Sequence, residues 1–180
     1  VPVYNEGSHV RATAASFSAL DYPRDRLSAF FIDDQSTDDT YGHLLAVVDQ
    51  YPWMQVVLNP RNMGKRLGIR NAVMRTQAEL VLSVDSDVIV DANSLKNLVR
   101  HMHSSGADAV GGCVFVSNAS ENWLTRMQAV KYWIGYQFLK NLENAFSHVM
   151  CLSGCLTRYR REALLAVDHQ LESRTLLGAE

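Results

Sequence analysis

An apolar stretch that ends in two carboxylates constrains this chain more than any other feature. Residues 80–84 read Leu-Val-Leu-Ser-Val, and Asp85-Ser86-Asp87 follows. A short apolar run containing two valines predicts a buried strand. Side chains alternate along a strand, so Asp85 and Asp87 would share one side if the strand extends to its tip. Two like charges this close favour a divalent cation, and oxygen ligands suit Mg²⁺ or Mn²⁺. The alternative is that these residues stabilise the N-terminus of a following helix.

The length and composition indicate one domain, or a large piece of one. The chain has 180 residues, of which 47% are apolar, and this is enough for a substantial core. Its 17 basic and 19 acidic residues nearly cancel, so the charge pattern of a nucleic-acid-binding protein is absent. The three cysteines (Cys113, Cys151 and Cys155) include no CxxC pair, which argues against a disulfide framework or a zinc site and favours reduced thiols.

The two ends of the sequence indicate a piece of a larger protein. The chain begins at Val1 without a methionine and ends at Glu180, so we expect one incomplete domain over residues 1–180, truncated at both ends. No signal peptide is evident. The longest apolar run, over residues 132–139, is far shorter than the ~20 residues that span a bilayer. We therefore expect this segment to be soluble, while its parent is free to carry membrane spans elsewhere.

Strand and helix patterns alternate along the chain. Residues 1–6 have the pattern of a strand end running into a loop. Further strands are expected at residues 27–32, 54–58, 80–84, 109–116, 149–153 and 156–159, and helices at 7–20, 38–50, 64–76, 92–104, 122–145 and 161–167. Such alternation predicts an α/β fold with a mostly parallel sheet flanked by helices on both faces.

Chemically suggestive residues follow four of these strands. They are the groups at residues 4–6, 33–34, 59–65 and 85–87. The carboxyl ends of parallel strands meet at one edge of a sheet, so the four groups are expected to converge on one ligand.

Two of these groups suggest a pocket for a flat, nitrogen-containing ring. Tyr4 offers an aromatic face, and Asp34 offers an acceptor for a ring N–H, as a pyrimidine base requires. The alternatives are a loop aromatic packed at the core edge for Tyr4, and turn or capping chemistry for Asp33 and Asp34.

A glycine and two cations open the helix expected from residue 64. Gly64, Lys65 and Arg66 stand where backbone N–H groups attract anions, and Lys65 adds a point charge. The pattern GxxxxGK[ST] of a Walker loop is absent. The alternative is a solvated basic face, which would include Arg70.

Taken together, these motifs resemble a known enzyme family. The motifs are Pro2-Val3-Tyr4-Asn5-Glu6, Asp33-Asp34-x-Ser36-Thr37-Asp38, Gly64-Lys65-Arg66, Asp85-Ser86-Asp87, Cys151-Leu152-Ser153-Gly154 and Tyr159-Arg160. In this order they resemble family 2 inverting glycosyltransferases, which have the GT-A (Rossmann-like nucleotide-sugar) fold. With Val110-Gly111-Gly112 and the aromatic helix, the chain looks most like the processive branch that includes hyaluronan, chitin and chitooligosaccharide synthases.

The resemblance implies a role for each site residue. Pro2, Tyr4 and Glu6 would line a uracil pocket of a UDP-sugar donor, and Asp34 would accept from the base. Lys65 and Arg66 would contact the base or pyrophosphate. Asp85 and Asp87 would be the catalytic pair, with Asp85 facing the ribose and metal and Asp87 binding Mg²⁺ or Mn²⁺. Cys151, Ser153 and Gly154 would lie on the side of the glycan acceptor.

The resemblance also implies what this segment lacks. The catalytic base of the family is expected just beyond Glu180, and the Gln-x-x-Arg-Trp motif is missing. Gln35 stands where glycine is common, and Cys155 where related synthases often have proline, which leaves the polymer open. The parent is expected at the cytoplasmic face of the cell membrane, with no nucleic-acid partner.

Some tryptophan and histidine residues have more than one interpretation. Trp123 and Trp133 fit sugar platforms or membrane-interface contacts, but we expect them to be core aromatics. His101 and His103 are expected to be solvated.

Two other functions are alternatives. In haloacid dehalogenase-like phosphotransferases a strand also ends in a DxD motif, although there the motif opens the domain. A nucleotide-sugar binding module without turnover is the other alternative, because the base is absent from the segment.

Overall fold

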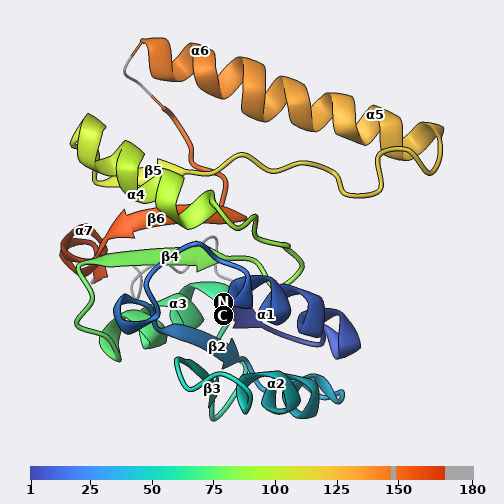
Figure 1. Ribbon diagram of the computed structural model, residues 1–180, viewed down its shortest axis with the longest axis vertical. Helices are drawn as coiled ribbons and strands as arrows, with labels where there is room; N and C mark the ends of the chain where they lie inside the picture. Colours follow the sequence, from blue (N-terminus) through green and yellow to red (C-terminus); the bar gives the residue numbers. More distant parts are fainter. Residues whose placement is uncertain (147–148, 169–180) are drawn as a thin grey trace, which may run out of the picture.

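The computed structural model describes residues 1–146 and 149–168 (Figure 1). Its strands are β1 (Pro2–Val3), β2 (Ala29–Asp33), β3 (Met54–Leu58), β4 (Leu80–Val84), β5 (Ala109–Gly111) and β6 (Leu156–Arg160). Its α-helices are α1 (Val10–Ser18), α2 (Thr40–Val48), α3 (Lys65–Met74), α4 (Ser94–Ser105), α5 (Trp123–Tyr132), α6 (Lys140–Ala145) and α7 (Arg161–Ala166). Short 3₁₀ turns occur at Gly7–His9 and Arg24–Arg26, and a π-helix at Trp133–Leu139 joins α5 to α6.

The first three strands form a parallel sheet in the order β1-β2-β3. Pro2 lies opposite Ile32, and Ala29 lies opposite Met54. Parallel neighbours need a crossover connection, and α1 and α2 provide the two crossovers. The two helices pack against each other, while α3 packs on β1 and β2. The predicted α/β fold, with a parallel sheet flanked by helices, is confirmed.

The second half of the chain adds a three-stranded sheet that is antiparallel. Its order is β4-β6-β5, so the last strand of the sequence lies between the two earlier ones. Val84, the last residue of β4, pairs with Leu156, the first residue of β6. The chain therefore re-enters this sheet at the edge where β4 ends and must run backwards along it, which the alternation of strands and helices did not reveal.

The core lies between the helices and the sheets. The expected apolar stripe of the first helix is buried: Val10 and Ala14 are fully covered, and Phe17 and Leu20 are nearly so. The ring of Phe17 meets that of Phe31 on β2 edge to face, with centroids 5.7 Å apart. Such an aromatic pair adds roughly 0.5–1.5 kcal/mol to the burial of its area.

Two glycines place α3 against the first sheet. Gly64 precedes the helix with φ of +80°, a conformation that disfavours other residues. Gly68 lies one turn into α3, where an added Cβ would be 3.4 Å from Pro2 Cβ and 3.7 Å from Ile32 Cγ2. The absence of a side chain at this position lets the helix backbone approach the strands whose ends form the site.

The predicted elements differ from the observed ones in two places. The strand expected at residues 109–116 stops at Gly111, because Gly112 N bonds to Leu156 O and β6 has no residue opposite the chain beyond it. The strand expected at residues 149–153 is an irregular connection. Other boundaries shift by one to three residues, as helix ends commonly do.

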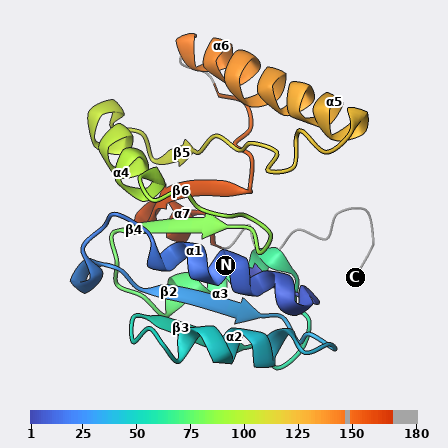
Figure 2. The same cartoon turned by 45° about the vertical axis from the view of Figure 1, so that its right-hand side comes forward.

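The expected helix over residues 122–145 is observed as α5, the π-helix and α6 in sequence, and we call it the long helix. Asn122 begins it with a capping box, in which Thr125 N donates to Asn122 Oδ1 over 3.0 Å. Figures 1 and 2 show the long helix lying apart from both sheets, beyond α4 and β5. The expectation that Trp123 and Trp133 are core aromatics is wrong in this structure, since they are 71% and 57% exposed.

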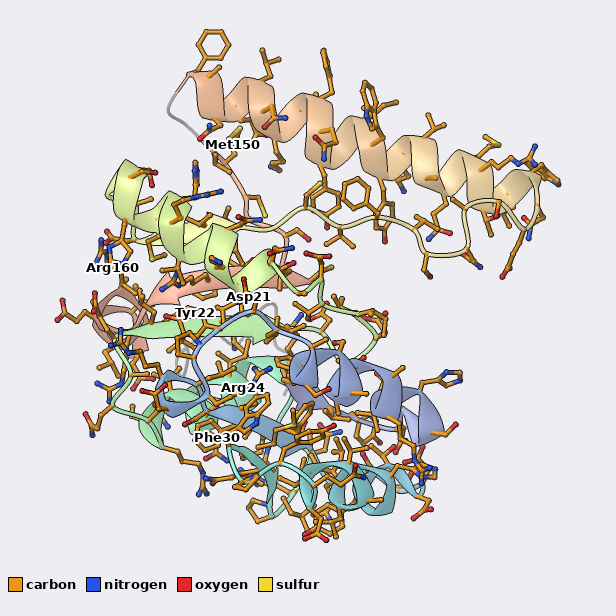
Figure 3. The ribbon with its side chains drawn as sticks, in the orientation of Figure 1. Asp21, Tyr22, Arg24, Phe30, Met150 and Arg160 are labelled. Carbon is orange, nitrogen blue, oxygen red and sulfur yellow. The ribbon has the colours of Figure 1, made fainter. Side chains whose placement is uncertain are left out.

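The long helix carries many exposed apolar side chains. Figure 3 shows that side chains stand out from this helix both away from the rest of the molecule and toward it. The exposed ones are Trp123, Leu124, Met127, Val130, Trp133, Ile134, Phe138, Leu139 and Leu142. Across the described residues, no helix combines the length and the apolar character needed to cross a bilayer.

Candidate functional site

The ends of β1, β2 and β4 and the start of α3 meet around one cavity. Its volume is about 310 Å³, and it is lined by Pro2, Val3, Tyr4, Glu6, Asp34, Lys65, Asp85, Ser86 and Asp87. The residue groups expected to converge therefore lie together, although they are separated by up to 85 positions in the sequence. Tyr4 is 47% exposed and so leaves its ring available to a ligand. Arg66 is exposed on the first turn of α3 and is not among the lining residues.

The carboxylate of Asp34 organises the loop that leads into α3. Asp34 is 4% exposed. Its Oδ1 accepts from Asn59 Nδ2 over 2.7 Å and from Met63 N over 2.9 Å, and its Oδ2 accepts from Gly64 N over 2.6 Å. Asn71 Nδ2 on α3 in turn donates to Asn59 Oδ1 over 2.7 Å. Asp34 thus sets where α3 begins, and with it the position of Lys65.

The hydrogen bonds of Asp34 within the protein bear on the role predicted for it. Asp34 was expected to accept from a base, and that role stays a prediction, but three protein donors already engage its carboxylate. Asn59 and Asn71 were assigned no role from sequence. Asn59 is fully buried directly after β3, and a buried amide needs partners, but only the fold shows which partners these are.

The Asp85-Ser86-Asp87 segment forms a turn and does not continue the strand. β4 ends at Val84, and Val88 N donates to Asp85 O over 3.2 Å. The alternation argument for the two carboxylates therefore does not apply, yet both line the cavity because the turn directs them there. Asp85 N donates to Cys155 O over 3.0 Å, which continues the pairing with the chain that enters β6.

Two side chains from the first part of the chain hold this turn. Glu6 Oε1 accepts from Ser86 Oγ over 2.6 Å, and Thr13 Oγ1 donates to Ser86 O over 2.7 Å. Glu6 was expected to line a uracil pocket. It does line the cavity, and its observed contact ties the loop after β1 to the turn after β4.

Lys65 joins three parts of the site. Its Nζ forms an ion pair with Asp85 Oδ1 and lies 3.4 Å from Gly154 O. The two side chains of the ion pair are 47% and 26% exposed, so the pair contributes at most about 1 kcal/mol to stability. The ion pair instead fixes the position of the ammonium group at the wall of the cavity. An added Cβ at Gly154 would come within 3.2 Å of Lys65 Nζ.

Asp85 and Asp87 are the candidate metal ligands. Asp87 is exposed, and within residues 1–146 and 149–168 its carboxylate makes no hydrogen bond or ion pair. Within the same residues, no group of three or more His, Cys, Asp or Glu side chains converges as a complete metal site. A pair of carboxylates on one cavity fits Mg²⁺ or Mn²⁺, which take their remaining ligands from substrate phosphates and water.

The segment expected on the acceptor side, residues 151–154, is not part of the lining of this cavity. Ser153 Oγ hydrogen-bonds Tyr136 Oη on the π-helix, and Ser153 O accepts from Thr157 Oγ1. Desolvation raises the pKa of the Tyr136 phenol, so it stays protonated near neutral pH. Cys151 is exposed. Ser153 therefore anchors the long helix to the start of β6, and Gly154 is the member of this segment that approaches Lys65.

Two non-glycine residues beside the site have positive φ. Asn5 has φ of 53° and Gln35 has φ of 64°. The preference for glycine at the position of Gln35 follows from this conformation. Asn5 links the first two loops, since its Oδ1 accepts from Thr37 N over 2.8 Å and its own N donates to Ser36 Oγ over 3.0 Å. The strain is thus held by hydrogen bonds between the loops that shape the cavity.

Comparison with known protein families assigns this chain to one of them. The profile of the family described as Glycosyl transferase family 2 matches residues 1–167. This chain belongs to glycosyl transferase family 2. A relative from Azorhizobium caulinodans named N-acetylglucosaminyltransferase is 33% identical over 99% of this chain and 45% of its own length. One of the same name from Mesorhizobium japonicum is 32% identical over 99% of this chain and 42% of its own length. The family 2 chain thus spans less than half of these relatives.

Solved structures share the fold of this family 2 chain. A mannosyltransferase from Pyrobaculum calidifontis, in complex with GDP-Man and Mn²⁺, aligns with a TM-score of 0.72 and 23% identity, over 92% of this chain and 44% of its own. S. aureus TarS in complex with UDP-GlcNAc aligns with a TM-score of 0.60 and 20% identity, over 93% of this chain and 46% of its own. At this identity the two structures establish the fold alone. The family assignment does not favour the haloacid dehalogenase alternative.

Proposed function

We propose that this chain is the donor-binding part of a glycosyltransferase that takes N-acetylglucosamine from UDP-GlcNAc and transfers it, with inversion, to a glycan acceptor. The observation that carries the proposal is the shared cavity, where an exposed aromatic ring, a lysine and two carboxylates meet. The names of the relatives support the sugar, and the UDP-GlcNAc complex of TarS supports the donor. The membrane-bound processive branch and a location at the cytoplasmic face of the cell membrane belong to the same proposal.

Each residue at the cavity has a task in this proposal. Tyr4 stacks on the uracil, and Pro2 borders it. Asp34 fixes the loop over the base and holds the start of α3, where the backbone N–H groups favour the diphosphate. Arg66 is exposed one residue further on, and it supplies charge to the approaching donor.

The leaving diphosphate would be stabilised by Lys65 and by a divalent cation. Asp87 and Asp85 would hold that cation, which would supply Lewis-acid stabilisation of the departing UDP. Lys65 places an ammonium group beside the same charge. The acceptor hydroxyl loses its proton to a base, which we place beyond Glu180. Glu180 lies outside the described residues.

Metal-dependent UDP binding tests the proposal. In the full-length protein, calorimetric titration should show UDP binding that weakens at least tenfold on chelation of Mn²⁺, a factor that corresponds to about 1.4 kcal/mol. Asp87→Asn should cause the same loss, because it removes the exposed carboxylate from the cavity. Asp49→Asn, at an exposed position after α2 and outside the cavity lining, is the matched control and should bind as the wild type does.

The alternatives give different results in the same experiments. UDP binding that is indifferent to both metal and Asp87→Asn would contradict the proposal. A binding module without turnover would bind UDP-GlcNAc in the full-length protein and release no UDP. A haloacid dehalogenase-like enzyme would release phosphate from phosphomonoesters.

A further inference from the structure

Asp87 lies on an irregular loop between β4 and α4. The loop covers residues 85–93, and the Asp87 carboxylate makes no hydrogen bond or ion pair within the described part of the chain. Contacts of its own side chain therefore do not fix where this carboxylate points, and the loop backbone must do so. Metal ligands keep their geometry through the partners behind them, so the contacts of this backbone decide how well a cation can be held.

Helix α1 forms hydrogen bonds with the loop backbone on both sides of Asp87. Thr13 Oγ1 donates to Ser86 O over 2.7 Å, and this residue directly precedes Asp87. Ser16 Oγ accepts from Val90 N over 3.1 Å, three residues after Asp87. Residues three positions apart lie on the same side of a helix, so the two hydroxyl groups face the loop together.

The hydroxyl of Thr13 has its partner in the loop although the residue lies in the core. Thr13 is 1% exposed, and Val90, which the neighbouring hydroxyl binds, is 4% exposed. Valine has nearly the same shape as threonine and would fill this position equally well if packing alone mattered. Without the hydroxyl, however, the carbonyl oxygen of Ser86 would lose its donor. The polar side chain at this buried position is thus explained by its bond to the loop.

The chain on either side of α1 adds two further bonds to the loop. Before the helix, Glu6 Oε1 accepts from Ser86 Oγ over 2.6 Å. After the helix, Asp21 N donates to Ala92 O over 2.8 Å. Within the described chain, the hydrogen bonds that residues 86–90 make to other elements all lead to Glu6 or to α1. The first helix and its flanks therefore hold the part of the loop that carries Asp87.

We propose that Thr13 and Ser16 position the Asp87 carboxylate for a divalent cation. They are positioning residues that act through the backbone of Ser86 and Val90, because neither of them lines the cavity. The inference rests on the proposed function, in which the cation binds together with the UDP donor. Loss of either hydroxyl should therefore reduce what the cation adds to UDP binding, and should not change the contacts of the nucleotide itself.

Calorimetric titration of the full-length protein with UDP, in Mn²⁺ and after chelation with EDTA, tests the inference. Thr13→Val and Ser16→Ala should each weaken UDP binding in Mn²⁺ about tenfold, the lower end of the roughly 10–100-fold loss that follows removal of a partner behind a metal ligand. UDP binding in EDTA should not change. Thr13→Ser keeps the hydroxyl and should bind as the wild type does. Ser18→Ala is the matched control on α1, because Ser18 Oγ donates to Ala15 O in its own helix.

Amide hydrogen exchange without metal or nucleotide measures the loop directly. Thr13→Val and Ser16→Ala should selectively speed exchange at Val90, whose N–H is held by the Ser16 hydroxyl. Leu44→Val controls for a general loss of stability, because Leu44 is fully buried on α2 and makes no contact of this kind with the loop. It should lower the Tm and leave both the exchange at Val90 and the effect of Mn²⁺ on UDP binding unchanged.

The possible results separate this inference from the proposed function. A wild-type protein whose UDP binding does not respond to Mn²⁺ would overturn the proposed function and the inference with it. If the wild type responds, normal Mn²⁺ dependence in Thr13→Val and Ser16→Ala would overturn the inference alone. An equal loss of UDP binding in EDTA, or the same loss of Mn²⁺ dependence in Leu44→Val, would also overturn it, because the hydroxyl groups would then serve only the stability of the fold.

Discussion

The carboxylate of Asp34 offers the sharpest test of how this site is built. Asp34→Asn keeps the shape of the side chain but replaces one carboxylate oxygen with an amide that donates. If the remaining oxygen stays with Asn59 and Met63, the new amide faces Gly64 N, which now lies 2.6 Å from Oδ2. A hydrogen bond to a charged group is lost, and the Gly64 N–H is left without its acceptor.

The magnitude follows from these contacts. A hydrogen bond to a charged group contributes roughly 1.5–3 kcal/mol, and the contacts that remain weaken because the acceptor is no longer charged. We expect Asp34→Asn to lower the free energy of unfolding by about 3 kcal/mol, which is about 6–12 °C in Tm for a domain of this size. The neighbouring Asp33→Asn is the matched control. Asp33 is also buried, but its Oδ1 accepts one hydrogen bond, from Ser36 N over 2.9 Å. Its Oδ2 has no partner among the described residues.

Urea unfolding of the full-length protein and its two variants measures the difference, with amide hydrogen exchange at Met63 and Gly64 as a local readout. Asp33→Asn should cost less than about 1 kcal/mol, because an amide oxygen can keep the bond from Ser36. Asp34→Asn should also speed exchange at Gly64 selectively. Equal losses in the two variants, or unchanged exchange at Gly64, would refute the view that Asp34 sets the start of α3.

Two further predictions concern the elements that carry the site. Gly68→Ala should fit at the contact distances to Pro2 and Ile32 and should stabilise the protein by about 0.5–1 kcal/mol, because alanine has the higher helix propensity. Gly68→Leu should destabilise the protein by about 1–3 kcal/mol, because the larger side chain overpacks the contact with the strands. Thermal unfolding of both variants measures these changes, and a stabilising leucine would contradict the prediction. Hydrogen bonds from Thr40 and Gly7 lower the pKa of Asp38. The carboxylate should therefore stabilise the fold above its ordinary pKa, and this stabilisation should be lost as the pH falls through the lowered pKa. Asp38→Asn should make the free energy of unfolding less sensitive to acid, and identical pH profiles of unfolding in variant and wild type would contradict this assignment.

Local patterns in the sequence determined most of the first half of this protein. Apolar spacing in residues 7–20 predicted the buried face of α1, and strands ending in polar residues predicted β2, β3 and β4. These features are local, because they depend on the periods of helix and strand and on turn residues. The convergence of Tyr4 and Lys65 followed from the same patterns, since parallel crossovers bring strand ends to one edge. Asp87 follows β4 of the antiparallel sheet and reaches the same cavity through the turn at residues 85–87.

Tertiary structure alone decided how the converging residues are used. Glu6 holds Ser86, Asp34 holds Gly64, and Lys65 pairs with Asp85, and each contact joins residues at least 20 positions apart. Hydrogen-bond partners of this kind depend on the relative placement of several loops, which no local pattern encodes. The reversed direction of β6 and the exposure of Trp133 have the same origin. Both depend on where the chain goes after the long helix, and this is set by which strand edges and surfaces are open in the folded molecule.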